Sequence, residues 1–261
     1  MKPQIELKIA GPLAEVIVDN RARRNAVNAA MWRQLHDVAQ ELSRNEQVRA
    51  VLVRGNGAAA FSAGADISDF DESRSDNQQS RSYDDLVESA CRAVEGIPQP
   101  TIAAIRGACV GAGMSIAASC DLIVAGDDAY FAVPAARLGL GYDPRGIERF
   151  LRVFGVRTAR RLLLCAEKMS AESAEKLGVV DVVVTAEKLS DVAGGMLQRI
   201  AMNAPLTVRA AKFAIFSQTV TRDDTRHAEA MRLAHLADNS TDYREGRAAF
   251  RDRRLPRFSG I

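Results

Sequence analysis

A glycine-rich stretch near the middle of the chain restricts the fold more than any other feature of the sequence. The apolar run 101–105 leads into residues 107–113, which hold three glycines, and a stretch of small residues follows. A short apolar run bounded by Pro100 and Gly107 is typical of a buried strand that ends in a tight turn, and the small residues at 112–119 predict a helix after it. The first turn of such a helix has unpaired N–H groups and favours an anion.

A second glycine turn has the same setting. Residues 61–67 read Phe-Ser-Ala-Gly-Ala-Asp-Ile and follow a short strand predicted at 50–53. Two such turns can each direct one backbone N–H at a single oxygen, which is how an oxyanion hole is built. Donors of this kind stabilise the enolate oxygen that forms when a thioester loses an α-proton, and losing one donor costs about 3 kcal/mol in the barrier.

The turn at 107–113 has two other interpretations. A dinucleotide site would need G-x-G-x-x-G, but Ile116 stands where the third glycine belongs. The turn also lies past residue 100, with no companion mononucleotide-binding unit, so we do not expect NAD. A purely structural turn packed against a helix of small residues is the other alternative, and the second glycine turn argues against it.

The remaining segments predict an α/β body followed by a helical C-terminal part. Alternating residues at 4–9 and 13–18 predict a hairpin, and further strands are expected at 121–124 and 180–184. Residues 186–253 have helical patterns. A helix is also expected from about Asn28, because the apolar residues after it recur at helical spacing: Met31, Leu35, Val38 and Leu42.

Two shorter segments carry local signals. The polar residues 70–82 predict a mobile surface loop, followed by a helix at about 83–94. Ser170 is a plausible N-cap, and Gly178 a plausible residue after the C-terminus, of a short helix between them.

The charge, hydropathy and cysteine content of the chain limit the kinds of partner that we expect it to bind. The formal net charge of +2 gives no reason to expect a nucleic-acid or membrane surface. No run of 18 apolar residues and no apolar leader occurs, so we expect a cytoplasmic protein. The four cysteines lie far apart, without metal-ligand or disulfide spacing, and are expected to be small buried thiols rather than a metal site.

Six segments, in order along nearly the whole chain, resemble the crotonase (enoyl-CoA hydratase/isomerase) superfamily. The family's F-x-A-G-x-D and G-x-x-x-G-[GA]-G segments correspond to 61–66 and 107–113, and its K/R-R-N-A segment corresponds to Arg-Arg-Asn-Ala at 23–26. Its C-D-[IL]-x-x-A strand, its F-x-x-P segment and its closing E-G-x-x-A-F segment correspond to 120–125, 131–134 and 245–250.

The resemblance implies an α/β spiral of β-β-α units over residues 1–195 and a helical oligomerisation region over 196–261. It also implies a homotrimer or a dimer of trimers. The ligand would be an acyl-CoA thioester, with coenzyme A as part of the substrate and no permanently bound cofactor.

The resemblance also implies roles for particular residues. The oxyanion donors would be the backbone N–H groups of Ala65 and Ala112, the latter usually glycine in the family. Positions similar to the family's coenzyme A contacts are Arg24 and Ala26 for phosphates and pantetheine, Ala63, Asp66 and Ile67 for the adenine pocket, and Phe250 and Arg253 for a neighbouring subunit's ligand.

The family pattern breaks where a hydratase needs two carboxylates beside one water. The family's hydratases have glutamates at the positions of Ser115 and Ala135. Ser115 can hydrogen-bond a water but cannot act as a base near neutral pH, and Ala135 can do neither. We therefore expect poor hydration of enoyl thioesters.

Asp143 is the one carboxylate that falls on a position where some of the family's isomerases carry an aspartate. An apolar site would raise its pKa towards neutrality, which suits a base that returns its proton. The alternative is an N-cap for a helix that starts at Pro144, since proline favours the first helical position.

The sequence thus predicts an acyl-CoA enzyme that stabilises a thioester enolate, with isomerisation preferred over hydration. A thioester hydrolase or a decarboxylase on the same scaffold is an alternative. A coenzyme A ligand-binding protein without chemistry is another. An RNA-binding relative would need a Lys-rich first helix, and residues 31–37 have mixed charge.

Overall fold

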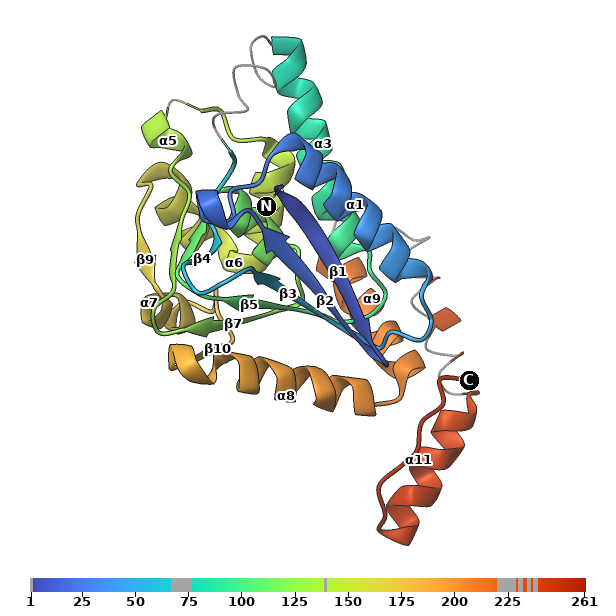
Figure 1. Ribbon diagram of the computed structural model, residues 1–261. Helices are drawn as coiled ribbons and strands as arrows, with labels where there is room; N and C mark the ends of the chain where they lie inside the picture. The colour runs from blue at the N-terminus through green and yellow to red at the C-terminus, as the bar shows by residue number, and fades with distance from the viewer. Residues whose placement is uncertain are drawn as a thin grey trace.

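The computed structural model describes residues 2–66, 77–138, 140–219, 229, 232–233, 236 and 239–261 (Figure 1). Its centre is a six-stranded sheet in the order β1 (Gln4–Ala10), β2 (Leu13–Asp19), β3 (Ala50–Gly55), β5 (Thr101–Ile105), β7 (Leu122–Gly126) and β10 (Val182–Val184). A smaller sheet has the order β4 (Ala60–Ser62), β6 (Ala108–Val110), β8 (Tyr130–Ala132) and β9 (Met169–Ser170). The α/β prediction is confirmed.

The larger sheet is parallel apart from one hairpin. β1 and β2 pair antiparallel, with Ile5 opposite Val18 and Leu7 opposite Val16, and the other pairings in this sheet are parallel. The four parallel strands β3, β5, β7 and β10 lie between helices, which explains their short apolar sequences. The strands predicted from the sequence, including the hairpin, are therefore confirmed.

Helices cover both faces of the larger sheet. On one side lie α1 (Ala29–Arg44), α3 (Asn77–Glu95), α4 (Ala112–Ala118) and α6 (Pro144–Leu164), and on the other lies α8 (Leu189–Met202) (Figure 1). Shorter elements complete the body: the 3₁₀ turns η1 (Arg21–Arg23) and η3 (Ala186–Lys188), and the helices α5 (Ala135–Leu138) and α7 (Ala171–Lys176).

The helix signals of the sequence are largely confirmed. Asn28 caps α1 by accepting from the Met31 N–H at 2.9 Å, and the predicted apolar face is buried apart from the half-buried Val38. Ser170 caps α7, and Gly178 follows that helix with φ +70°. The segment 70–82 needs a correction. Residues 70–76 lie outside the described part. Residues 77–82 form the first turns of α3 and not a loop. These residues are polar, and residues 78–82 mostly face solvent, so the sequence shows no helical apolar pattern there.

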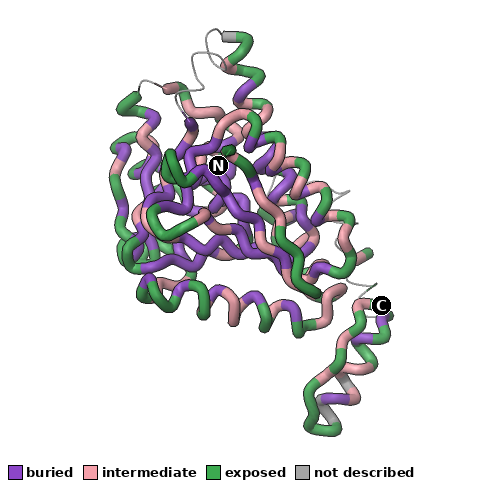
Figure 2. The backbone as a smooth tube through the Cα atoms, in the orientation of Figure 1, coloured by how far each residue is buried: buried purple, intermediate pink, exposed green. Residues whose placement is uncertain are grey.

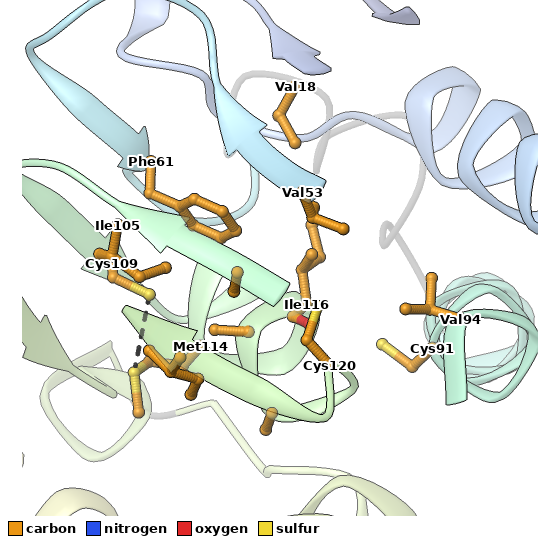
Figure 3. Packing of buried hydrophobic residues seen from close by; sticks show 14 of the residues in the cluster. Val18, Val53, Phe61, Cys91, Val94, Ile105, Cys109, Met114, Ile116 and Cys120 are labelled. Atoms are coloured by element: carbon orange, nitrogen blue, oxygen red, sulfur yellow. Dashed lines mark hydrogen bonds between the residues drawn. The ribbon is translucent and has the colours of Figure 1, made fainter. Parts of the chain in front are cut away.

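The main core fills the space between the two sheets and their covering helices (Figure 2). Figure 3 shows its centre, where Phe61, Val53 and Ile105 pack towards Met114 and Ile116 of α4. Three of the cysteines belong to this core: Cys91, Cys109 and Cys120 are buried, whereas Cys165 is exposed. Burial raises the pKa of Cys91 to about 11 and that of Cys120 to about 12, so both stay protonated.

A second core lies under α8, where Leu189, Ala193 and Leu197 pack on β3, β5 and β7. Residue 195, the predicted boundary of the C-terminal region, lies within this helix. Beyond it come α9 (Pro205–Thr219) and α11 (Thr241–Asp252), and α11 extends away from the body in Figure 1. None of the described helices combines the length and apolarity needed to cross a membrane.

Candidate functional site

The two glycine turns lie side by side because the strands before them pair. β4 and β6 run parallel, with Ala60 opposite Ala108. Gly64 and Gly111, in the turns that follow, have φ values of +117° and +49°, which favour glycine. A Cβ on Gly111 would lie 3.8 Å from the Gly64 Cα. The smaller sheet thus brings together two segments about fifty residues apart in sequence.

Each turn leaves at least one backbone N–H without a partner among the described residues. Ala112 is the first residue of α4, and the first bond in that helix runs from the Ser115 N–H to the Gly111 carbonyl at 3.0 Å. Around Ala65, the Val27 N–H donates to Gly64 and the Asp66 N–H donates to Val27, both at 2.9 Å. Neither the Ala65 nor the Ala112 N–H takes part in these bonds, and both residues line one cavity.

The cavity has a volume of about 450 Å³ and a largely apolar wall. Ser115 and Ala135, at the positions where the resemblance would place hydratase glutamates, both line it and are 5% and 6% exposed. Val133 and Leu140 are among the apolar wall residues. The two positions therefore face the same space, and neither supplies a carboxylate.

The Ser115 hydroxyl has a partner that the sequence did not predict. Its Oγ lies 2.9 Å from the hydroxyl of Tyr142, which also lines the cavity. Burial raises the pKa of Tyr142 above its usual range, so the phenol stays protonated. The contact could not be predicted from the sequence, because the two residues are 27 apart and no periodicity or spacing links them.

Asp143 lines the cavity but is held by its own helix. It is the N-cap of α6, with Pro144 next, and its Oδ1 accepts from the Arg145 N–H at 2.8 Å. The Arg145 guanidinium also donates to Oδ2 at 2.7 Å. These bonds, those of the Arg145 side chain first, lower the pKa of Asp143. The predicted cap is confirmed, and the predicted rise in pKa is wrong because a cation adjoins the carboxylate.

The predicted coenzyme A positions divide into two groups. Ala26, Ala63 and Asp66 line the cavity. Arg24 does not line it: it is exposed, has φ +51°, and its carbonyl accepts from the Ala63 N–H at 2.9 Å. The arginine that does line the cavity is Arg23, whose Nη1 lies 2.6 Å from Asp66 Oδ1. The doublet at 23–24 was thus recognised, but the sequence could not tell which residue faces inward.

The three other predicted positions are Ile67, Phe250 and Arg253. Ile67 lies outside the described residues, and so does the side chain of Phe250 within α11. Arg253 is exposed just beyond α11, which extends away from the α/β body (Figure 1). Of these three residues only Arg253 has a described side chain, and it does not line the cavity.

A buried ion-pair cluster at the cavity wall was missed entirely. Arg149 of α6 lies 3.0 Å from Glu88 and 3.1 Å from Glu95, both on α3, and Arg149 and Glu88 line the cavity. Arg152 also pairs with Glu95. The partners are more than fifty residues apart and none of them belongs to a motif, so only the fold, which brings these parts of α3 and α6 together, shows the cluster.

Comparison with known proteins agrees with this geometry. The family model described as enoyl-CoA hydratase/isomerase matches residues 8–260. The short-chain-enoyl-CoA hydratase of Clostridium acetobutylicum is 32% identical over 80% of this chain and 79% of its own length. The 2,3-dehydroadipyl-CoA hydratase of Escherichia coli is 29% identical, over 92% of each chain.

Solved structures show the same architecture. An enoyl-CoA hydratase/carnithine racemase from Magnetospirillum magneticum superimposes with a TM-score of 0.92 at 32% identity, covering 98% of this chain and 96% of its own. The match of the fold and of the family model leads to one conclusion. The chain belongs to the enoyl-CoA hydratase/isomerase family of the crotonase superfamily.

Proposed function

We propose that this chain is an enzyme that acts on acyl-CoA thioesters and stabilises the enolate oxygen of its substrate with the Ala65 and Ala112 N–H groups. The observation that carries the proposal is the pair of unpartnered backbone donors, from two adjoining turns, at one apolar cavity. Donors fixed by the backbone in an apolar site need no reorganisation when charge develops on the oxygen. The relatives named above, which act on enoyl-CoA substrates, support the ligand class.

Isomerisation remains preferred over hydration. Hydration needs a water activated on one side and a proton delivered to the α-carbon, and two carboxylates normally share that work. Ser115 and Ala135 offer none. Four described carboxylates line the cavity, and three of them, Asp66, Glu88 and Asp143, are each paired with an arginine; the fourth is Asp84. A base role for Asp143 would require Arg145 to release it, so the geometry favours the cap.

The arginine pairing also supports a second candidate, a ligand-binding protein that holds acyl-CoA without converting it. A decarboxylase or a thioester hydrolase could use the same oxyanion hole. Turnover of any acyl-CoA would exclude the ligand-binding protein. Identifying the products would then distinguish an isomerase from a decarboxylase or a thioester hydrolase.

We also propose that the ligand's phosphates lie near Arg24 and that the chain forms a homotrimer or a dimer of trimers. In that assembly Phe250 and Arg253 would approach a neighbour's coenzyme A. The exposed Arg24 and the projecting α11 are consistent with both ideas.

Calorimetric titration with butyryl-CoA and crotonyl-CoA tests the ligand class. We expect micromolar dissociation constants, and Arg24→Ala should weaken binding about 5-fold through the loss of one exposed charge contact. Arg44→Ala, at the exposed end of α1, is the matched control and should change nothing. No heat and no thermal shift with either thioester would rule out the proposal.

A further inference from the structure

The hydroxyl pair Ser115–Tyr142 lies beside the proposed oxyanion site. Ser115 is three residues after Ala112 in α4, so it lies about 4.5 Å further along the helix axis on the same side. Both hydroxyl-bearing residues line the cavity. An acyl chain whose thioester oxygen meets the Ala112 N–H would therefore bring its next few carbons past this pair.

The surrounding structure holds the Tyr142 ring in place. A Cβ on Gly146, in the first turn of α6, would lie 2.9 Å from Tyr142 Cε1, so the ring packs directly on the backbone there. The Phe150 ring lies beside it, with 5.5 Å between centroids. The hydroxyl is thus oriented by contacts on its ring as well as by Ser115.

The pair keeps hydrogen-bonding capacity for a ligand. A hydroxyl has one donor and two acceptor sites. The Ser115 Oγ lies 3.4 Å from the Gly111 carbonyl, as well as 2.9 Å from the Tyr142 hydroxyl. If Ser115 donates to Tyr142, the phenol proton is left for a ligand. If Ser115 donates to Gly111, the pair still offers acceptor sites.

We propose that Ser115 and Tyr142 form an uncharged binding site for a hydroxyl substituent at carbon 3 of the acyl chain. The inference rests on the proposed function and adds to it the residues that select the substrate. Carbon 3 is two bonds from the thioester carbon, which matches the position of Ser115 one helical turn from Ala112. The wall around the pair is apolar. It would therefore tolerate a saturated acyl chain, whereas a charged substituent without a partner would lose its hydration there.

Paired titrations with butyryl-CoA and 3-hydroxybutyryl-CoA, each configuration separately, test the inference. The wild-type protein should bind at least one 3-hydroxy thioester about 3- to 10-fold more tightly, the range expected for one net hydrogen bond. Tyr142→Phe keeps the ring contacts and should reduce this preference to near unity, while butyryl-CoA affinity and Tm stay unchanged. Ser115→Ala should reduce the preference as well.

Tyr130→Phe is the matched control, because Tyr130 on β8 does not line the cavity, and it should retain the preference. Equal binding of both thioesters by the wild-type protein overturns the inference. So does a preference that survives both Tyr142→Phe and Ser115→Ala. The butyryl-CoA titration distinguishes a failure of this inference from a failure of the proposed function. If butyryl-CoA does not bind at all, the proposed function itself is contradicted.

Discussion

Asp143 could act as a helix cap or as a catalytic base, and these two roles make conflicting demands on its side chain. A helix cap needs a carboxylate that accepts from the first N–H groups, whereas a base near neutral pH needs a raised pKa. The carboxylate accepts from the backbone and the guanidinium of Arg145, which favours its charged form. The sequence showed the proline that marks the helix start, but not that the following arginine would turn back onto the cap.

Asp143→Asn separates the two roles, because asparagine is also a good N-cap. We expect the variant to retain turnover within about 10-fold, since general acid–base help is worth roughly 10²–10⁴-fold. Rates are to be measured on the first thioester found to be converted, together with its affinity and the Tm.

The control is Asp85→Asn, which removes the other carboxylate bound to Arg145, at 2.7 Å, and does not line the cavity. A fall in turnover of 10²-fold or more in Asp143→Asn alone, with binding and Tm intact, would make Asp143 the base after all.

At the level of the elements, α3 and α6 are joined through charge rather than through apolar contacts alone. Arg149 is 2% exposed and contacts two glutamates of α3 that are nearly as buried. Without Arg149, the negative charges of Glu88 and Glu95 would be less compensated, although Arg152 still pairs with Glu95. Breaking such a buried pair from one side destabilises more than the pair itself stabilises.

Arg149→Met should therefore lower the free energy of unfolding by about 3–5 kcal/mol, measured by urea denaturation. Arg92→Met is the matched control: Arg92 also pairs with Glu88, but its side chain is 64% exposed, and it should cost under about 1 kcal/mol. Adding Glu88→Gln to Arg149→Met should recover part of the loss. An Arg149→Met variant as stable as Arg92→Met would contradict this account.

For the whole molecule, local signals predicted most of the fold. The hairpin, the buried face of α1 and the cap of α7 follow from periodicity and from cap residues, because these depend on neighbours in sequence. The start of α3 did not follow, since its first turns bury no apolar face. The pairing of the two turns was predicted because each glycine turn follows a short strand, and the family motifs include both turns.

The remaining parts of the site depend on tertiary packing. Tyr142 reaches Ser115 from 27 residues away, and Arg149 reaches Glu88 from 61 residues away. No periodicity or spacing encodes such contacts. Arg23 rather than Arg24 lines the cavity, and Arg24 has a left-handed backbone; the sequence alone predicts neither feature.

The central claim is that the backbone N–H of Ala112 stabilises a thioester enolate, and Ala112→Pro tests it most directly. Proline removes this N–H and is tolerated at the first helical position, whereas Ala112→Gly keeps the N–H. Turnover of a panel of acyl-CoA thioesters is to be followed by mass spectrometry. We expect the wild-type protein and Ala112→Gly to convert at least one thioester, and Ala112→Pro to be slower by about 10²–10³-fold with its Tm maintained. Undiminished turnover by a folded Ala112→Pro variant, or no conversion of any thioester by the wild-type protein, would contradict the claim.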